Sequence, residues 1–170
     1  MTRFALVVVL AVLGACSAPP AQETATPKEL EAASGPVAGP TADKTRVLPG
    51  DIAALRVVDS AVGEVVADRE QNTLYLNTGD GTSPPRPTCV EPECTLVWPP
   101  LLAAGGRVEA AGVDRALVGT VRRPDGLEQV TIAGHPVHRH VDDEQAGDTT
   151  GHGTDGRWYA IAPNGAKASK

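Results

Sequence analysis

The sequence predicts an all-β domain, a small antiparallel meander or sandwich, preceded by a disordered tether. Short runs rich in Val, Leu, Ile and Thr recur between Gly, Pro, Asp and Asn, at a spacing of about 8 to 12 residues that is typical of small β folds. None of these runs keeps the period of an amphipathic helix over a dozen positions. The stretch that contains them, residues 51–165, has the length of a single domain.

Two turns between the predicted strands have a clear chemical basis. Pro124 presets the backbone for a turn and Gly126 accepts a positive φ, so the chain should reverse there. Ala133 and Gly134 predict a second, tighter reversal. The C-terminal half should therefore form a β-meander over residues 116–141. The predicted strands are residues 55–59, 63–67, 73–77, 116–121, 128–132, 136–141 and 157–162.

The N-terminus is typical of a lipoprotein signal peptide. Arg3 supplies a positive charge, and the apolar run over residues 4–13 is too short to cross a bilayer as a helix. Small residues then lead into Cys16, whose thiol would receive a lipid before cleavage. We therefore expect residues 1–15 to be the signal peptide and Cys16 to anchor the protein on the extracytoplasmic face of a cell membrane. The alternative is an ordinary signal peptide that a cysteine follows by chance.

The segments that flank the β domain are predicted to have no fold of their own. Residues 16–50 consist largely of Ala, Pro, Thr, Ser, Gly and Glu, which bury too little apolar surface to offset the entropy of ordering. Such a tether would hold the domain on the order of 30 Å from the bilayer. Residues 166–170 are expected to form a short tail. The lipid would then be the chain's contact with the membrane.

Two cysteines, Cys89 and Cys94, remain once Cys16 is assigned to the lipid. Outside the cytoplasm, neighbouring thiols normally oxidise, so we expect a disulfide that clips the loop leading into Trp98. The alternative is a redox-active or metal-binding pair. Thioredoxin-like and zinc-knuckle motifs have a shorter spacing between their cysteines, which favours the disulfide clip.

Several short motifs resemble, in their order, a known family of bacterial lipoproteins. They are Thr73-Leu74-Tyr75 with Asp80, Cys89 with Cys94, Trp98-Pro99-Pro100-Leu101, Arg123-Pro124-Asp125-Gly126 with Gln129-Val130-Thr131, Gly134-His135-Pro136-Val137, Gly147-Asp148-Thr149, Gly151-His152-Gly153 and Gly156-Arg157-Trp158. The family is described as a secreted repeat of unknown function and is marked by a Tyr-x-aromatic-x-x-Asp motif. The resemblance implies two related β units, the first ending near Trp98 and the second near Trp158. It implies no activity.

The chain departs from this family motif in both units. The first unit, from Tyr75 to Asp80, has Asn77 where an aromatic residue is expected. In the second unit, from His138 to Asp143, the two histidines His138 and His140 take the places of the Tyr and the aromatic residue. Each unit keeps the acidic residue of the motif.

All four histidines of the chain, His135, His138, His140 and His152, lie in one short region, which raises the alternative of a metal site. On a strand, His138 and His140 would point to the same face. Such a pair could bind Zn²⁺ or Cu²⁺, with His152, Asp142 or Asp143 completing the shell. His152 also stands where similar proteins often have Gln. The other interpretation is that the imidazoles replace half-buried aromatic rings and form hydrogen bonds with the backbone.

The sequence contains none of the common catalytic motifs: a nucleophile elbow, a P-loop, a metalloprotease helix or a dinucleotide fingerprint. We therefore expect no enzyme activity. The net charge of −6 disfavours nucleic acid as a partner. The predicted function is a non-catalytic domain that binds a component of the cell envelope, such as an envelope protein, and needs no cofactor. The alternative is a histidine-centred lipoprotein that binds Zn or Cu.

Overall fold

The structure is a computed structural model that describes residues 52–170. The predicted signal peptide, Cys16 and the tether over residues 16–50 lie outside the described residues. Within the described part, short strands in small, mostly antiparallel sheets dominate and helices are few. The predicted all-β class is confirmed.

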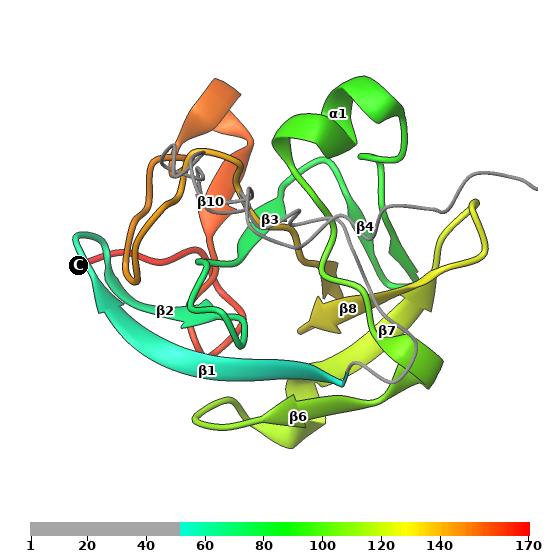
Figure 1. Cartoon of the computed structure of the whole chain (residues 1–170), viewed down its shortest axis with the longest axis horizontal. Coiled ribbons are helices and arrows are strands. Elements are labelled where there is room, and N and C mark those ends of the chain that lie inside the picture. The colour runs from blue at the N-terminus through cyan, green and yellow to red at the C-terminus, as the bar shows by residue number, and fades with distance from the viewer. Residues whose placement is uncertain (1–51) are drawn as a thin grey trace, which may run out of the picture. The chain divides into compact units, whose positions relative to one another are not determined.

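The first sheet is built on a hairpin of β1 (Ala53–Ser60) and β2 (Gly63–Ala67), which are antiparallel (Figure 1). The hairpin turns at Gly63, whose φ of +98° suits a residue without a side chain. The Ser60 hydroxyl closes the turn by donating to the carbonyl of Gly63 at 2.6 Å. A third strand, β6 (Val108–Ala110), pairs in parallel with the start of β1. The sheet is therefore not purely antiparallel, because a long connection lets the chain return in the same direction.

The predicted meander forms the second sheet. At its first turn, the amide of Arg123 donates to the carbonyl of Leu127 at 2.8 Å, and Gly126 has a φ of +84°. At its second turn, Ala133 and Gly134 have φ values of +50° and +81°, as a tight hairpin turn with two left-handed residues requires. The strands are β7 (Val118–Arg122), β8 (Glu128–Ile132) and β9 (His135–Pro136).

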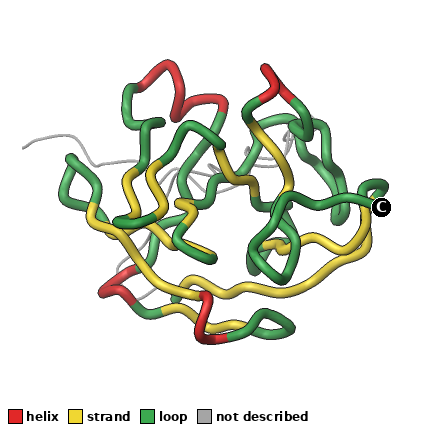
Figure 2. The backbone as a smooth tube through the Cα atoms, turned by 180° about the vertical axis from the view of Figure 1, so that it is seen from behind, coloured by secondary structure: helices red, strands yellow, loops and turns green. Residues whose placement is uncertain are grey.

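Long loops join the remaining elements, as the backbone trace shows (Figure 2). The short strands are β3 (Tyr75–Asn77), β4 (Gly81–Thr82), β5 (Pro85–Arg86) and β10 (Trp158–Ala160), and three 3₁₀ turns cover Ala104–Gly106, Arg115–Leu117 and Thr154–Gly156. The helix α1 (Pro92–Val97) was not predicted. It begins with Pro92, which has no N–H. In the first turn of a helix an N–H has no partner within the helix, so proline suits this position.

Matching backbone hydrogen bonds confirm the two related β units. We call them the first and second β units; they are residues 53–101 and 118–161. In the first unit, the amide of Leu74 donates to the carbonyl of Val66 at 2.8 Å. In the second unit, the amide of Val137 donates to the carbonyl of Val130 at 3.0 Å. The hairpin β1–β2 thus corresponds to the hairpin β7–β8.

Each β unit pairs with the closing segment of the other unit. At the end of the second unit, β10 pairs with β3, with Ala160 opposite Tyr75. At the end of the first unit, Pro100 lies opposite His138 in the same way. The two units also meet directly, because Tyr75 and His138 exchange backbone hydrogen bonds of 2.8 and 3.0 Å. The strand predicted over residues 136–141 is therefore shorter in the structure. β9 ends at Pro136, and His138 pairs across with the first unit instead.

Two apolar clusters stabilise the crossed units. The larger one is aliphatic and packs beneath the hairpins; its most deeply buried members are Leu55, Val66, Leu74, Leu76, Val130, Ile132, Val137 and Ile161. The smaller one is aromatic and lies where the units cross; it contains Tyr75, Trp98 and Trp158, together with Val65, Cys89, Ala160 and Ala168. Three of the four Tyr and Trp rings in residues 52–170 are therefore gathered at one place, while the fourth, Tyr159, packs against the aliphatic cluster.

The segment expected to be a tail is part of the domain. Ala168 is buried in the aromatic cluster, and its amide donates to the carbonyl of Ala160 at 2.8 Å. The amide of Ala162 donates to the carbonyl of Ala166 at the same distance. The predicted tail over residues 166–170 is therefore wrong as far as Ala168, because these residues extend the pairing of β10.

Candidate functional site

The centre of the candidate site is a stacked pair of tryptophans, one from each β unit. The rings of Trp98 and Trp158 are 4.0 Å apart between centroids and nearly parallel, at 4°. Trp98 follows α1, and its amide donates to the carbonyl of Cys94 at 2.8 Å. Trp158 begins β10. Stacked rings at this distance add to the free energy of folding beyond the area that they bury.

Three further rings surround the tryptophan pair, and two of them, Tyr75 and His138, lie in matching positions. Tyr75 lies edge-on to Trp98 at 5.3 Å, and His138 lies edge-on to Trp158 at 5.1 Å. His140 packs on Trp98 at 4.4 Å. The two histidines therefore stand where the family motif has aromatic rings, as one of the two sequence interpretations expects.

The tyrosine and the acid of the family motif meet across the two units. The hydroxyl of Tyr75 donates to the Oδ2 atom of Asp143 at 2.7 Å, and both side chains are buried. Burial and this hydrogen bond raise the pKa of Tyr75, so the phenol stays protonated. The Oδ1 atom of Asp143 accepts from the amide and hydroxyl of Thr150. The Oδ1 atom of Asp80 accepts in the same way from Thr88, but its buried Oδ2 atom has no hydrogen-bond partner within residues 52–170.

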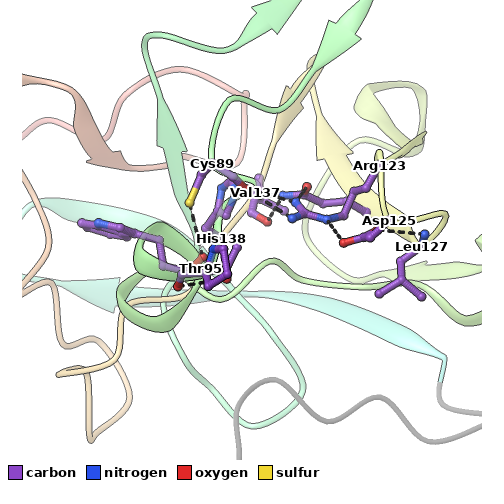
Figure 3. Close-up of polar contacts among 10 residues, drawn as sticks. Cys89, Thr95, Arg123, Asp125, Leu127, Val137 and His138 are labelled. Carbon is purple, nitrogen blue, oxygen red and sulfur yellow. Dashed lines mark hydrogen bonds and ion pairs between the residues drawn. The ribbon is translucent and has the colours of Figure 1, made fainter.

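A buried arginine, Arg123, organises the polar contacts on the other side of the site (Figure 3). Its side chain is 1% exposed and donates to the Oε1 atom of Gln129 at 2.7 Å and to the carbonyl of Cys89 at 3.3 Å. Its Nε atom pairs with the carboxylate of Asp125 at 3.0 Å. Sequence reasoning missed this role, because an arginine beside a predicted turn is normally exposed.

This network determines the protonation of His138. Since Arg123 has only donors, the Oε1 atom of Gln129 must accept and its Nε2 group must donate. The Nε2 atom of His138, 3.1 Å from that group, is therefore the acceptor, and the ring proton lies on Nδ1. Complete burial, followed by the nearby charge of Arg123, lowers the pKa of His138 to about 3. The ring is neutral across the physiological pH range.

The structure does not bring the three candidate metal ligands together. His138 uses Nε2 for Gln129, whereas the Nδ1 atom of His140 lies 2.9 Å from the hydroxyl of Thr150. His152 accepts at Nδ1 from the amide of Ala160 at 3.3 Å. Residues 52–170 contain no group of three or more His, Cys, Asp or Glu side chains that could hold a metal ion. The arrangement thus favours the histidines as replacements for aromatic rings.

The expected disulfide is present and lies beside the tryptophan pair. Cys89 and Cys94 are bonded, with their Cα atoms 5.5 Å apart. Cys89 is buried against the aromatic cluster, while Cys94 lies in α1 and is partly exposed. The bond therefore fixes α1 and the loop leading to Trp98, as the sequence predicts.

An open pocket of about 550 Å³ adjoins the disulfide and Trp158. Its other lining residues are Asn77, Thr88, Asp155 and Arg157. Sequence reasoning marked Asn77 as a departure from the family motif but did not assign it a place in a pocket. The signal that could have found the pocket is this missing aromatic residue.

The disulfide, the crossed β units and the shared aromatic cluster define a small β domain suited to an oxidising compartment. Residues 119–162, which make up nearly all of the second β unit, match the family described as a secreted repeat of unknown function. The family resemblance of the sequence is therefore confirmed over this segment. No curated protein and no solved structure matches the chain. In the part described here, residues 52–170, no helix has the length and apolar character needed to cross a membrane.

Proposed function

We propose that this protein is a lipid-anchored lipoprotein whose β domain is a non-catalytic binding module of the cell envelope. The observation that carries the proposal is the disulfide-clipped domain, whose second unit matches a secreted repeat family and which follows a lipoprotein-type N-terminus. A disulfide of this kind persists outside the cytoplasm. The lipid on Cys16 would hold the domain at the membrane surface.

The internal contacts of the site support binding rather than chemistry. Tyr75 and Asp143 are hydrogen-bonded to each other inside the domain. Arg123, Gln129 and His138 form a second buried chain of contacts. The Tyr75–Asp143 pair and the hydrogen bond from Arg123 to the carbonyl of Cys89 join the two units, so these polar groups have a structural role. The surface that remains for a partner includes the open pocket.

Anchoring is tested by replacing Cys16 with serine. The variant should lose the lipid, and it should appear as an uncleaved precursor or as a soluble product, because a serine hydroxyl is not the thiol that is lipidated. Fractionation of cells and mass spectrometry measure both outcomes. The double variant Cys89→Ser/Cys94→Ser is the control and should keep the lipid. Mature-sized Cys16→Ser protein in the membrane fraction would contradict the anchor.

Envelope binding is tested with the mature chain made without its lipid, beginning at Ser17. We expect this protein to sediment with washed cell envelopes in a saturable manner, because the domain itself recognises an envelope component. The control is a peptide of residues 17–50, which should stay in the supernatant. Binding by this peptide alone, or no saturable binding by the whole mature chain, would contradict a binding role for the domain.

A further inference from the structure

The pocket beside Trp158 lies at a position where the two β units differ. Asn77 lies directly opposite Trp158 in the pairing of β3 with β10. The matching position in the second unit is His140, whose ring packs on Trp98 at 4.4 Å. The short side chain of Asn77 supplies no such ring, and the open pocket adjoins this position of the first unit.

The amide of Asn77 is built into this pocket. The residue is 6% exposed, and its Oδ1 atom accepts from the amide of Gly79 at 2.8 Å. Its Nδ2 group forms no hydrogen bond with any other residue in the range 52–170, yet the side chain lines the pocket. The Nδ2 atom is open to solvent in the pocket, so it is free to donate a hydrogen bond to a ligand there.

Two oppositely charged side chains lie at the same pocket. Asp155 and Arg157 both line it, and within residues 52–170 neither side chain forms a hydrogen bond or an ion pair. Asp155 has a φ of +54°, which is uncommon for a residue with a side chain and costs free energy unless its surroundings hold it. The pocket thus presents one carboxylate and one guanidinium, with no net charge between them.

We propose that this pocket binds a neutral sugar ring of an envelope glycan, a proposal that rests on the proposed envelope-binding function. Sugar hydroxyls both donate and accept, so they can satisfy Asn77, Asp155 and Arg157 together. Trp158, which is 4% exposed, and the disulfide supply the small apolar part of the lining, and ligand sites combine apolar surface with a few polar groups. The absence of net charge disfavours a phosphate or a simple cation. A zwitterionic amino acid would fill only a small part of about 550 Å³.

The test measures binding of the tetrasaccharide of N-acetylglucosamine to the full lipid-anchored chain in detergent micelles. Trp98 and Trp158 are the two tryptophans of the chain, so their fluorescence reports on the pocket directly. We expect saturable binding, and at least tenfold weaker binding by Asn77→His, which copies the ring of the second unit. Near-ultraviolet circular dichroism should show that this variant keeps its fold.

Arg157→Ala is the second variant, because its side chain is exposed and its loss does not threaten the fold. It should also weaken binding at least tenfold, whereas Arg122→Ala, another exposed arginine, should leave binding unchanged. Equal affinity in wild type, Asn77→His and Arg157→Ala would overturn the pocket as the site. Saturable binding of alanine in place of the sugar would overturn the ligand class.

The outcome with cell envelopes separates this proposal from the proposed function. If the mature chain binds washed envelopes but not the tetrasaccharide, the sugar proposal is wrong and the envelope-binding function stands. If it binds neither, both are wrong. If it binds both, and Asn77→His weakens both, the pocket is the surface through which the domain recognises the envelope.

Discussion

Replacing Trp158 with alanine is expected to lower the free energy of unfolding by about 3–5 kcal/mol, the usual cost of deleting a buried aromatic side chain. The ring is 4% exposed and contacts both Trp98 and His138, which come from different β units. Its loss removes the stacked partner of Trp98 and the edge contact of His138. Urea unfolding followed by far-ultraviolet circular dichroism measures the change. For a domain of this size, the loss is a large part of the total stability.

Two comparisons make the tryptophan experiment specific. Leu96→Ala removes a large apolar side chain that is 74% exposed, and it should change the free energy of unfolding by less than about 0.5 kcal/mol. Trp98→Ala should cost as much as Trp158→Ala, but the double variant should cost less than the two together, because residues in contact are not additive. Full additivity would show that the rings do not stabilise each other.

Acid should destabilise the domain through His138. Its pKa in the folded protein is about 3, below the ordinary histidine value of about 6.5 that applies to the unfolded chain. Between these two values the unfolded chain binds a proton that the folded domain does not. The contribution is therefore fully present above pH 6.5 and is lost as the pH falls toward 3, at about 1.4 kcal/mol for each pH unit.

The variant His138→Gln isolates this contribution. Glutamine keeps an acceptor for Gln129 but does not titrate, so the stability of the variant should depend less steeply on pH between 6.5 and 4. Urea unfolding at a series of pH values gives both slopes. His135, whose pKa is also lowered by burial, accounts for part of the remaining slope in the same direction. Identical slopes in wild type and His138→Gln would mean that His138 is not buried as a neutral ring.

Local signals in the sequence predict the hairpins well. The strands expected over residues 63–67 and 128–132 have those bounds in the structure, because β2 begins at Gly63 and β8 ends beside Ala133, and both of these residues have a positive φ. The turns after Pro124 and at Ala133 also follow from their own residues. Where pairing is local, the chemistry of a few neighbouring side chains is sufficient.

The crossed pairing and the candidate site depend on distant parts of the chain. Nothing near His138 indicates that its backbone pairs with Tyr75 rather than continuing β9. Arg123 can be buried because it donates hydrogen bonds to the carbonyl of Cys89 and to the side chain of Gln129, and Cys89 is distant from it in the sequence. The family resemblance did mark Asn77, His138 and His140 as departures, and each of them lies at a position where the two halves of the site differ.

The crossed pairing also bears on how such a domain can arise and change. A single β unit would leave the strand that corresponds to β3 without the segment that pairs with it. Two separate copies would therefore have to associate as a symmetric dimer. In this chain both copies are joined, and the partner is always present. Duplication followed by fusion releases each copy from symmetry, because a substitution then affects one position instead of two. Asn77 against His140, and Tyr75 against His138, are differences that a symmetric ancestor could not carry.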